Sequence, residues 1–150
     1  MALLLDKRGD EIQITENVLK AAASNGSHGT IALLLDKRGD EIRITEDVVK
    51  AAAQNTGSGL AIMALLLDTR GDEIQITENS LEAAAANSKS GPGIIALFLE
   101  THKEIPITEN VLKAAASNHG IDQEIIALLL KTPGEGIQIT ENVLKAVAEN

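Results

Sequence analysis

The sequence predicts an all-α protein, a solenoid of five helix-turn-helix units stacked in one row. Three observations support this prediction. A block of about 31 residues recurs five times, each block holds a helix-forming run that follows a threonine, and each also holds a second run rich in leucine. Units of this length bury their apolar faces only against neighbouring units, which is the arrangement of a solenoid.

The repetition is strongest at the start of the chain, where segments 1–25 and 31–55 are identical at 20 of 25 aligned positions. The block ALLLD and its variants ALFLE and ALLLK recur at similar spacing, and start at Ala2, Ala32, Ala64, Ala96 and Ala127. We therefore predict a single domain of 150 residues with approximate repeats at 1–25, 26–55, 56–87, 88–118 and 119–150.

The first helix of each unit is predicted from runs such as ITENVLKAAASN at 14–25. Thr15 is a suitable N-cap, Glu16 favours the positive end of the helix dipole, and Asn25 is a plausible stop. Three consecutive alanines have high helix propensity and permit close approach of neighbouring helices. The same pattern begins again at Thr45, Thr77, Thr108 and Thr140.

The second helix is predicted from the leucine-rich runs, for example Leu60–Arg70. Three successive leucines cover more than half of a helix circumference, which suits a helix packed between its own partner and two neighbouring units. We expect Gly9, Gly39 and Gly71 to end these helices in a left-handed conformation and the following DEIQI segment to be an extended link. The glycine-rich turns at 57–59 and 91–93 are interpreted as flexible connections.

These residues resemble ankyrin repeats. The segment ITEDVVKAAAQN at 44–55 is similar to the first ankyrin helix, and LAIMALLLDTRGDEI at 60–74 is similar to the second helix and its end. The link is short, so we expect the ankyrin β-hairpin finger to be shortened or absent. The repeat sequences also resemble the C-terminal arrays of fungal NLR-like (STAND) proteins. This resemblance implies a sensor arm that recognises a ligand or partner beside a nucleotide-binding domain.

Arg-Gly-Asp occurs at 8–10, 38–40 and 70–72 and raises the question of cell adhesion. We favour a structural interpretation, because arginine in the last turn of a helix is stabilised by the helix dipole and glycine is a common helix end. The fourth and fifth units lack the tripeptide but keep a helix stop at 102–103 and 133–134. No signal peptide is visible, and adhesion is therefore kept only as a minor alternative.

The composition of the chain indicates which partners and which cellular location to expect. The chain is 44% hydrophobic with a net charge of −9, and it has one aromatic residue and no cysteine. An acidic surface repels phosphates, so we expect neither nucleic acid nor membrane as a partner. No apolar run is long enough to cross a bilayer, and the lack of cysteine fits a reducing compartment, so we expect a cytoplasmic location.

No residue pattern points to catalysis, a metal or a cofactor. The histidines have no second ligand at metal-binding spacing, the glycine-rich turns do not follow a strand or precede a Gly-Lys-Thr/Ser motif, and no serine is paired with a histidine. The acidic pairs on the links are interpreted as solvated surface. We expect no enzyme, although nucleotide turnover would revive that alternative.

Two surfaces are candidates for partner binding. The first is a row of charged side chains on the first helices. It is either a solvated face with Glu-to-Lys salt bridges between residues four apart, or a face that binds a partner. It comprises Glu16, Lys20, Glu46, Lys50, Glu78, Glu82, Glu109, Lys113, Glu141 and Lys145. The second is the rim of variable turns, because binding loops commonly vary on a fixed frame; it comprises His28, Thr56, Ser58, Lys89, His119 and Asp122.

The predicted function is recognition of a protein or ligand by a non-catalytic scaffold within a larger intracellular protein. The alternative is a structural module that stacks end to end, because neither terminal unit carries the polar outer face that normally caps a solenoid. We favour a slice of a longer array as the reason for the open ends.

Overall fold

The computed structural model describes residues 14–102, 104–118, 122–130 and 140–148. In this part of the chain every regular element is helical. The α-helices are α2 (Glu16–Ser24), α3 (His28–Arg38), α4 (Glu46–Gln54), α5 (Gly59–Arg70), α6 (Glu78–Ala85), α7 (Gly91–Thr101), α8 (Glu109–Ala116), α9 (Asp122–Leu130) and α10 (Glu141–Ala148). Two 3-10 turns, η2 (Gly39–Glu41) and η3 (Gly71–Glu73), follow α3 and α5.

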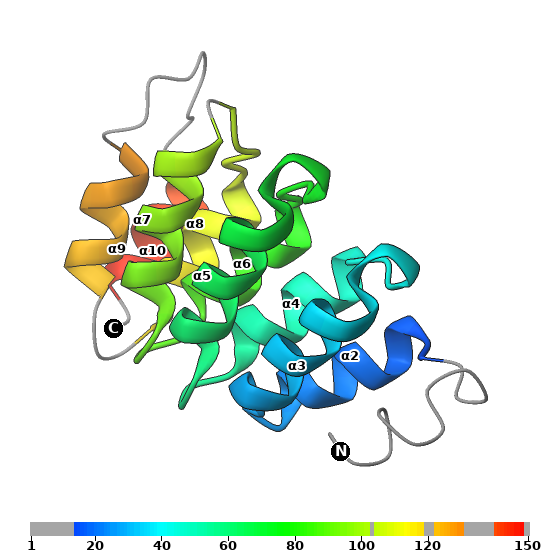
Figure 1. Cartoon of the computed structure of the whole chain (residues 1–150). Coiled ribbons are helices and arrows are strands. Elements are labelled where there is room, and N and C mark those ends of the chain that lie inside the picture. Colours follow the sequence, from blue (N-terminus) through cyan, green and yellow to red (C-terminus); the bar gives the residue numbers. More distant parts are fainter. Residues whose placement is uncertain (1–13, 103, 119–121, 131–139, 149–150) are drawn as a thin grey trace.

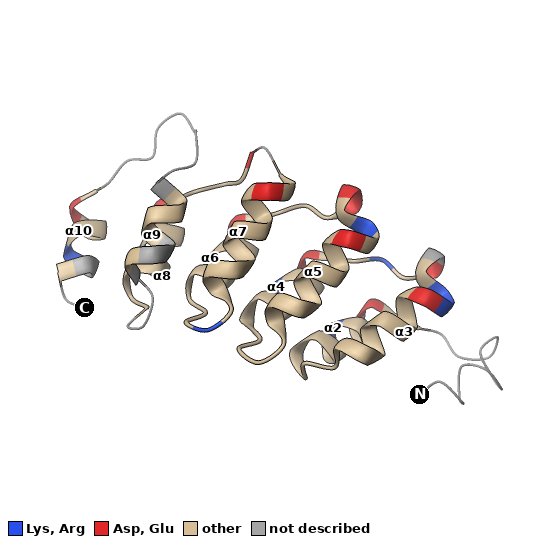
Figure 2. Ribbon diagram, turned by 60° about the vertical axis from the view of Figure 1, so that its left-hand side comes forward, with Lys and Arg blue, Asp and Glu red and all other residues tan. Residues whose placement is uncertain are grey.

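The helices form two layers in a single row (Figure 1). The first helices α2, α4, α6, α8 and α10 pack side by side in one layer, and the second helices α3, α5, α7 and α9 form the other. Among the described helices, the most extensive contacts join each unit to the units beside it, and α2 and α10 lie at opposite ends of the row (Figure 2). The predicted all-α solenoid is confirmed.

One apolar core runs through the whole array. The alanines of the first helices, such as Ala52 and Ala84, are fully buried, and their small side chains allow these helices to approach closely. Larger side chains of the second helices fill the space between the layers, including Phe98, the only aromatic residue of the sequence. A repeat therefore shares its interior with both neighbours, as expected for a solenoid.

The links contain no strand among the described residues, so the predicted shortening or loss of the ankyrin finger holds in this region. The link is not extended along its whole length as we expected. Its first residues form the 3-10 turns η2 and η3, and the extended backbone begins at Ile42 and Ile74.

The expected left-handed helix ends at Gly39 and Gly71 are wrong. Their φ angles are −53° and −54°, both right-handed, because the chain continues from the α-helix directly into a 3-10 turn. The glycine with positive φ among the described residues is Gly26, at 70°, in the turn between α2 and α3. Gly9 lies outside the described residues.

Some glycines of the glycine-rich turns belong to helices. Gly59 is buried as the first residue of α5, and a Cβ placed on it would lie 2.6 Å from the backbone oxygen of Ala52. Gly93 lies within α7, where a Cβ would come within 2.9 Å of Leu60. Close packing on the Ala52 backbone therefore requires glycine at 59, whereas the atoms nearest to Gly93 belong to the movable side chain of Leu60.

Candidate functional site

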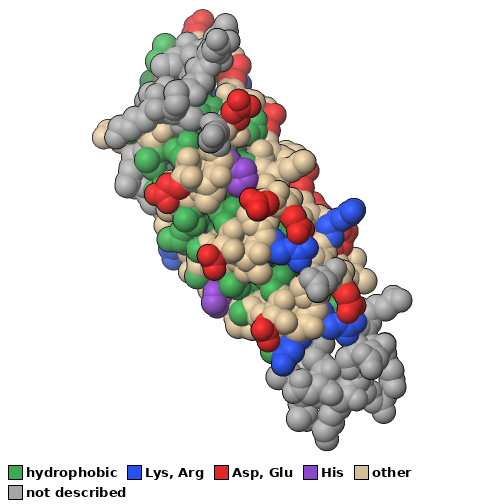
Figure 3. Space-filling model, turned by 45° about the horizontal axis from the view of Figure 1, so that its top comes forward, with side chains coloured by type: hydrophobic (Ala, Val, Ile, Leu, Met, Phe, Trp, Pro, Cys, Tyr) green, Lys and Arg blue, Asp and Glu red, His purple; other side chains and the backbone are tan. Residues whose placement is uncertain are grey.

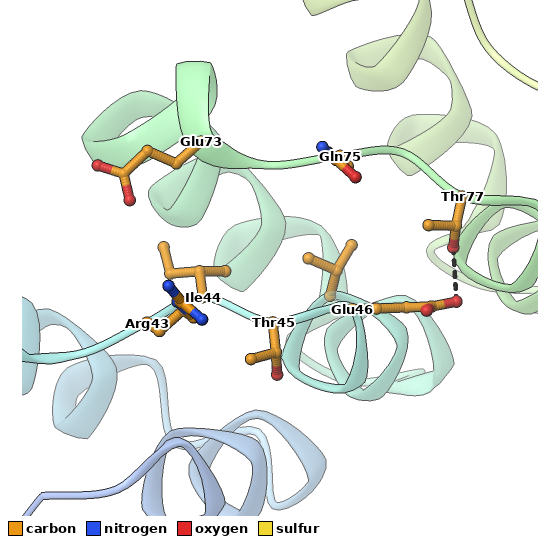
Figure 4. Close-up of a pocket in the computed structure, with 8 residues that line it drawn as sticks. Arg43, Ile44, Thr45, Glu46, Glu73, Gln75 and Thr77 are labelled. Atoms are coloured by element: carbon orange, nitrogen blue, oxygen red, sulfur yellow. Dashed lines mark hydrogen bonds between the residues drawn. The ribbon is translucent and has the colours of Figure 1, made fainter.

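The glutamates that begin the first helices form a ladder between repeats, which we call the glutamate ladder. Each of Glu46, Glu78 and Glu109 accepts hydrogen bonds from a threonine and an asparagine of the next repeat. The Thr77 hydroxyl donates to Glu46 Oε1 at 2.8 Å (Figure 4). Asn79 Nδ2 donates to the same oxygen, also at 2.8 Å. The other two rungs are Thr108 and Asn110 to Glu78, at 2.8 and 3.0 Å, and Thr140 and Asn142 to Glu109, at 3.0 and 3.1 Å.

These hydrogen bonds stabilise the ionised carboxylates. The Asn79 amide and the Thr77 hydroxyl lower the pKa of Glu46 below its ordinary value of 4.5. The ammonium group of Lys113, 3.0 Å away, together with the donors of Asn142 and Thr140, lowers the pKa of Glu109 in the same way. The glutamates thus act as fixed acceptors that hold successive first helices in register.

The rung at the start of the array differs. Asp47 occupies the position that is asparagine in the other repeats, and a carboxylate cannot donate a hydrogen bond to Glu16. Asp47 instead pairs with Lys20 Nζ at 2.5 Å, and this ion pair lowers the pKa of Asp47. The hydroxyl oxygen of Thr45 is buried without a hydrogen-bond partner, so this rung also lacks its threonine bond.

Of the predicted Glu-to-Lys pairs, one forms within its helix, and in another the lysine binds the next repeat instead. Glu109 and Lys113 form the expected pair, but Lys20 reaches across to Asp47 rather than to Glu16. Among the described residues no such pair joins Glu46 and Lys50, whereas Glu109 binds both Lys113 and the donors of the next repeat.

The threonine caps are also only partly as predicted. The hydroxyls of Thr77, Thr108 and Thr140 each accept from the backbone N–H three residues later, but those of Thr15 and Thr45 do not.

An asparagine ladder, which sequence reasoning missed, lies at the other end of the first helices. Asn87 Nδ2 donates to the backbone oxygens of Ala53 and Asn55 in the preceding repeat, at 2.7 and 3.2 Å. Its Oδ1 accepts from the backbone N–H groups of Lys89 and Ser90, which lead into α7.

Asn55 repeats this arrangement one unit earlier, and Asn118 Nδ2 donates to Ala85 at 2.9 Å. The sequence signal was available, because an asparagine ends every unit, but we interpreted Asn25 only as a helix stop. A side chain that binds across the repeat boundary is not distinguishable in sequence from one that ends its own helix.

Two of the Arg-Gly-Asp arginines, Arg38 and Arg70, bind other groups of the protein, and Arg8 lies outside the described residues. Arg70 binds both carboxylate oxygens of Glu73 at 2.7 Å, and its Nη1 donates to the backbone oxygen of Gly39 in the preceding repeat, also at 2.7 Å. Arg38 binds Glu41 in the same two-pronged way, and each arginine lowers the pKa of its glutamate. These contacts give the arginines a structural role and support the structural interpretation of the motif.

The predicted variable rim is only partly a free surface. His28 begins α3 and is exposed, as are Thr56 and Lys89. Ser58 is half-buried, and its backbone N–H donates to Asn55 Oδ1. His119 lies outside the described residues, and Asp122 is the first residue of α9.

Two hollows lie on the described surface near the candidate residues. One of about 440 Å³ has a polar lining that includes Arg43, Glu46 and Gln75, at the start of α4 (Figure 4). The other, of about 670 Å³, is more apolar and lies over α5 and α7, with Leu65 and Leu97 in its lining. Figure 3 shows hydrophobic side chains among acidic ones on a face of the molecule.

No group of three or more His, Cys, Asp or Glu side chains that could hold a metal ion occurs in the described ranges. A search of the same residues for a membrane-spanning helix finds none with the necessary length and apolar character.

Comparison with known protein families shows to which family the chain belongs. A model described as a domain of unknown function, DUF7104, matches five consecutive segments, at 3–31, 33–63, 65–94, 97–125 and 128–150. The chain belongs to the DUF7104 family. No curated protein and no solved structure matches the sequence.

The five DUF7104 matches coincide in number with the five repeats that the internal comparison predicts. Each full DUF7104 match starts within the leucine-rich run and ends near the start of the next one. The glutamate and asparagine ladders join residues 30 to 34 positions apart. They are therefore contacts between successive DUF7104 repeats.

Proposed function

We propose that this chain is a non-catalytic scaffold for protein recognition, and that its binding surface is the exposed face of its first helices. The proposal rests on which positions vary in sequence from one repeat to the next. The residues of the two ladders and the alanine core vary little between repeats, whereas a half-exposed position four residues after the ladder glutamate changes sign. That position holds Lys20, Lys50, Glu82, Lys113 and Lys145.

Because position 82 is glutamate instead of lysine, the middle of this face carries an excess of negative charge. On α4 and α6 the exposed and half-exposed side chains include Glu46, Asp47, Glu78 and Glu82, with Lys50 as the opposing charge. A rigid surface with this excess of carboxylates favours a protein partner that presents basic side chains. The same negative charge disfavours nucleic acid and anionic membrane.

We also propose that the array is ankyrin-like and acts as the sensor arm of a larger intracellular protein of the fungal NLR-like type. Support for this comes from the length of the repeat, the two helices in each unit and the absence of cysteine. The non-catalytic character is supported by the shifted carboxylates in the described part of the chain, whose pKa values are lowered by structural partners rather than raised in a cleft.

The test is a charge reversal at the variable position. Glu82→Lys installs the residue that the other four repeats carry, so the fold is expected to tolerate it. The matched control is Glu100→Lys, which makes the same charge change on an exposed residue of α7 in the other layer. The native chain and both variants are immobilised, and the proteins that each retains from a cell extract are quantified.

The proposal predicts at least one protein that the native chain and Glu100→Lys retain and that Glu82→Lys loses. The proposal is wrong if the three chains retain the same proteins, or if none is enriched by the native chain.

A further inference from the structure

The second helices are apolar on their exposed side as well as on their buried side. In α5 every residue from 60 to 67 is apolar, and in α7 every residue from 94 to 99 is apolar. A helix that is apolar all round is ordinarily buried on every side. Yet Ala61 and Ala64 of α5 are exposed, and Leu60 is 42% exposed. In the described part of the chain, an apolar surface in the middle of the array is therefore open.

This open surface recurs from repeat to repeat. The hollow of about 670 Å³ over α5 and α7 is lined by Leu65 and Leu97, together with Ala61 and Ala64. Leu65 and Leu97 occupy the same position of successive repeats, and their side chains are half-buried. The half-buried leucines at this position, which we call the leucine row, are Leu33, Leu65, Leu97 and Leu128. The row crosses the second helices, so a ligand that follows it runs along the array.

A line of carboxylates borders the leucine row. Asp36, Asp68 and Glu100 each follow a leucine of the row by three residues, which places them on the same side of their helices, and all three are exposed. Figure 2 shows acidic positions in red toward the ends of α3, α5 and α7. Lys37 Nζ lies 4.0 Å from Asp36, whereas Asp68 and Glu100 form no ion pair with another described residue. Asp68 also lines the hollow.

We propose that this outer side of the second helices binds an amphipathic helix of a protein partner. The partner helix lies across α3, α5 and α7, with its apolar face on the leucine row and a basic flank toward the carboxylates. Its large apolar side chains enter the hollow above Ala61 and Ala64, where the small side chains leave room. This surface is separate from the exposed face of the first helices, and it binds a different feature of a partner.

The spacing of the repeats determines the spacing of the basic residues. Neighbouring helices pack about 8–10 Å apart, and seven residues of an α-helix cover about 10.5 Å. Basic side chains seven residues apart therefore meet the carboxylates of successive repeats. A β-strand covers about the same distance in three residues, which places successive side chains on opposite faces. A polyproline helix also repeats after about 9 Å, and the experiment compares it directly.

The test measures binding of a labelled synthetic peptide by fluorescence anisotropy. The peptide is an amphipathic helix of about 21 residues, long enough to cross three repeats, with leucines on one face and a lysine at every seventh position on one flank. A first control peptide has the same composition with its lysines on the polar face opposite the leucines. A second is a proline-rich peptide with a lysine at every third position.

Two variants of the protein test the two parts of the surface. Asp68→Lys reverses one carboxylate, and the fifth repeat already has lysine at this position, Lys131. Ala64→Glu fills the hollow at an exposed position and adds a negative charge, so a loss of binding to the basic peptide is steric. Glu82→Lys, the same charge reversal in the layer of first helices, is the matched control. Circular dichroism confirms that each variant keeps its helix content.

The native chain and Glu82→Lys should bind the helical peptide equally, and Asp68→Lys should bind it about tenfold more weakly. Ala64→Glu should also bind it more weakly, and higher salt should weaken binding to the native chain. The control peptide with displaced lysines should bind more weakly than the helical peptide.

The proposal is wrong if the native chain does not bind the helical peptide at low salt, or if both surface variants bind it as the native chain does. Tighter binding of the proline-rich peptide rejects a helical partner, and an equal loss in Glu82→Lys assigns the binding to the first helices. Self-association of the native chain that Ala64→Glu abolishes, measured by sedimentation velocity, would show that a second copy covers this surface instead. None of these results bears on the exposed face of the first helices as a site for other proteins.

Discussion

The glutamate ladder makes a specific prediction about Asp47, the one position where a rung is broken. Asp47→Asn provides the amide that Asn79, Asn110 and Asn142 supply in the later repeats. Glu16 then accepts from the introduced amide and from the Thr45 hydroxyl, which in the native chain is buried without a partner. The change removes the Lys20–Asp47 ion pair, whose side chains are 45% and 63% exposed, so little stability is lost with it.

The expected gain comes mainly from the Thr45 hydroxyl. A buried hydroxyl without a partner costs about 1–3 kcal/mol, and the loss of a carboxylate near the helix N-terminus offsets part of the recovery. We therefore expect Asp47→Asn to stabilise the array by about 1 kcal/mol, which corresponds to about 2–4 °C in Tm for a domain of this size. Because the sequence has no Trp or Tyr, the measurement is thermal and urea unfolding followed by far-UV circular dichroism.

Two comparisons test the reasoning. Salt screens the Lys20–Asp47 pair, so the advantage of Asp47→Asn should grow as the salt concentration rises. Asn110→Asp is the opposite change in a repeat where the residue facing it is Glu82 instead of a lysine, so it should destabilise by about 1–2 kcal/mol. An Asp47→Asn chain that is no more stable than the native chain at low and high salt would refute the role assigned to the rung.

Three further predictions concern the packing, the asparagine ladder and the lowered pKa values. Gly59→Ala should lower the free energy of unfolding by about 1–3 kcal/mol in the same urea assay, because its Cβ would meet the Ala52 oxygen at 2.6 Å. Gly71→Ala is the control and should be neutral or stabilising, because Gly71 has a right-handed φ and its Cβ would meet no atom within 4 Å. Asn87→Ala should cost about 2–4 kcal/mol, because buried backbone groups in two repeats lose their partner; a loss below that of an average surface substitution would contradict the ladder. The folded chain lowers the pKa of Glu109 below 4.5, so the ionised form is stabilising: its contribution is complete above that value and is lost as the pH falls through the lower folded-state pKa. Glu109→Gln should therefore show a smaller loss of urea stability than the native chain as the pH is lowered below about 4.5, and equal losses would argue against the carboxylate.

The secondary structure was accessible from sequence because it depends on local chemistry. The run from Glu46 to Gln54 follows a threonine and contains three alanines, and the helix has those bounds. The predicted second helix at Leu60–Arg70 begins one residue earlier in the structure, at Gly59. The position of Phe98 in the shared core likewise follows from its place in a leucine-rich run.

The failures occurred where a side chain has partners both within its own repeat and in the next. Glu46 and Lys50 are spaced for a pair on one helix, yet Glu46 is bound by Thr77 and Asn79. Gly71 has the residue type of a left-handed helix end, yet it starts a 3-10 turn in which Arg70 binds Glu73. Local spacing cannot decide between such partners.

The sequence by itself determined that this chain is a row of two-helix units, because helix propensity, apolar spacing and an internal repeat are properties of neighbouring residues. Only the tertiary structure decided which surfaces remain open. The side chains of Glu46 and Asn87 bind groups of a neighbouring repeat. That distinction depends on distances between residues about thirty positions apart, which become fixed only when one repeat packs on the next.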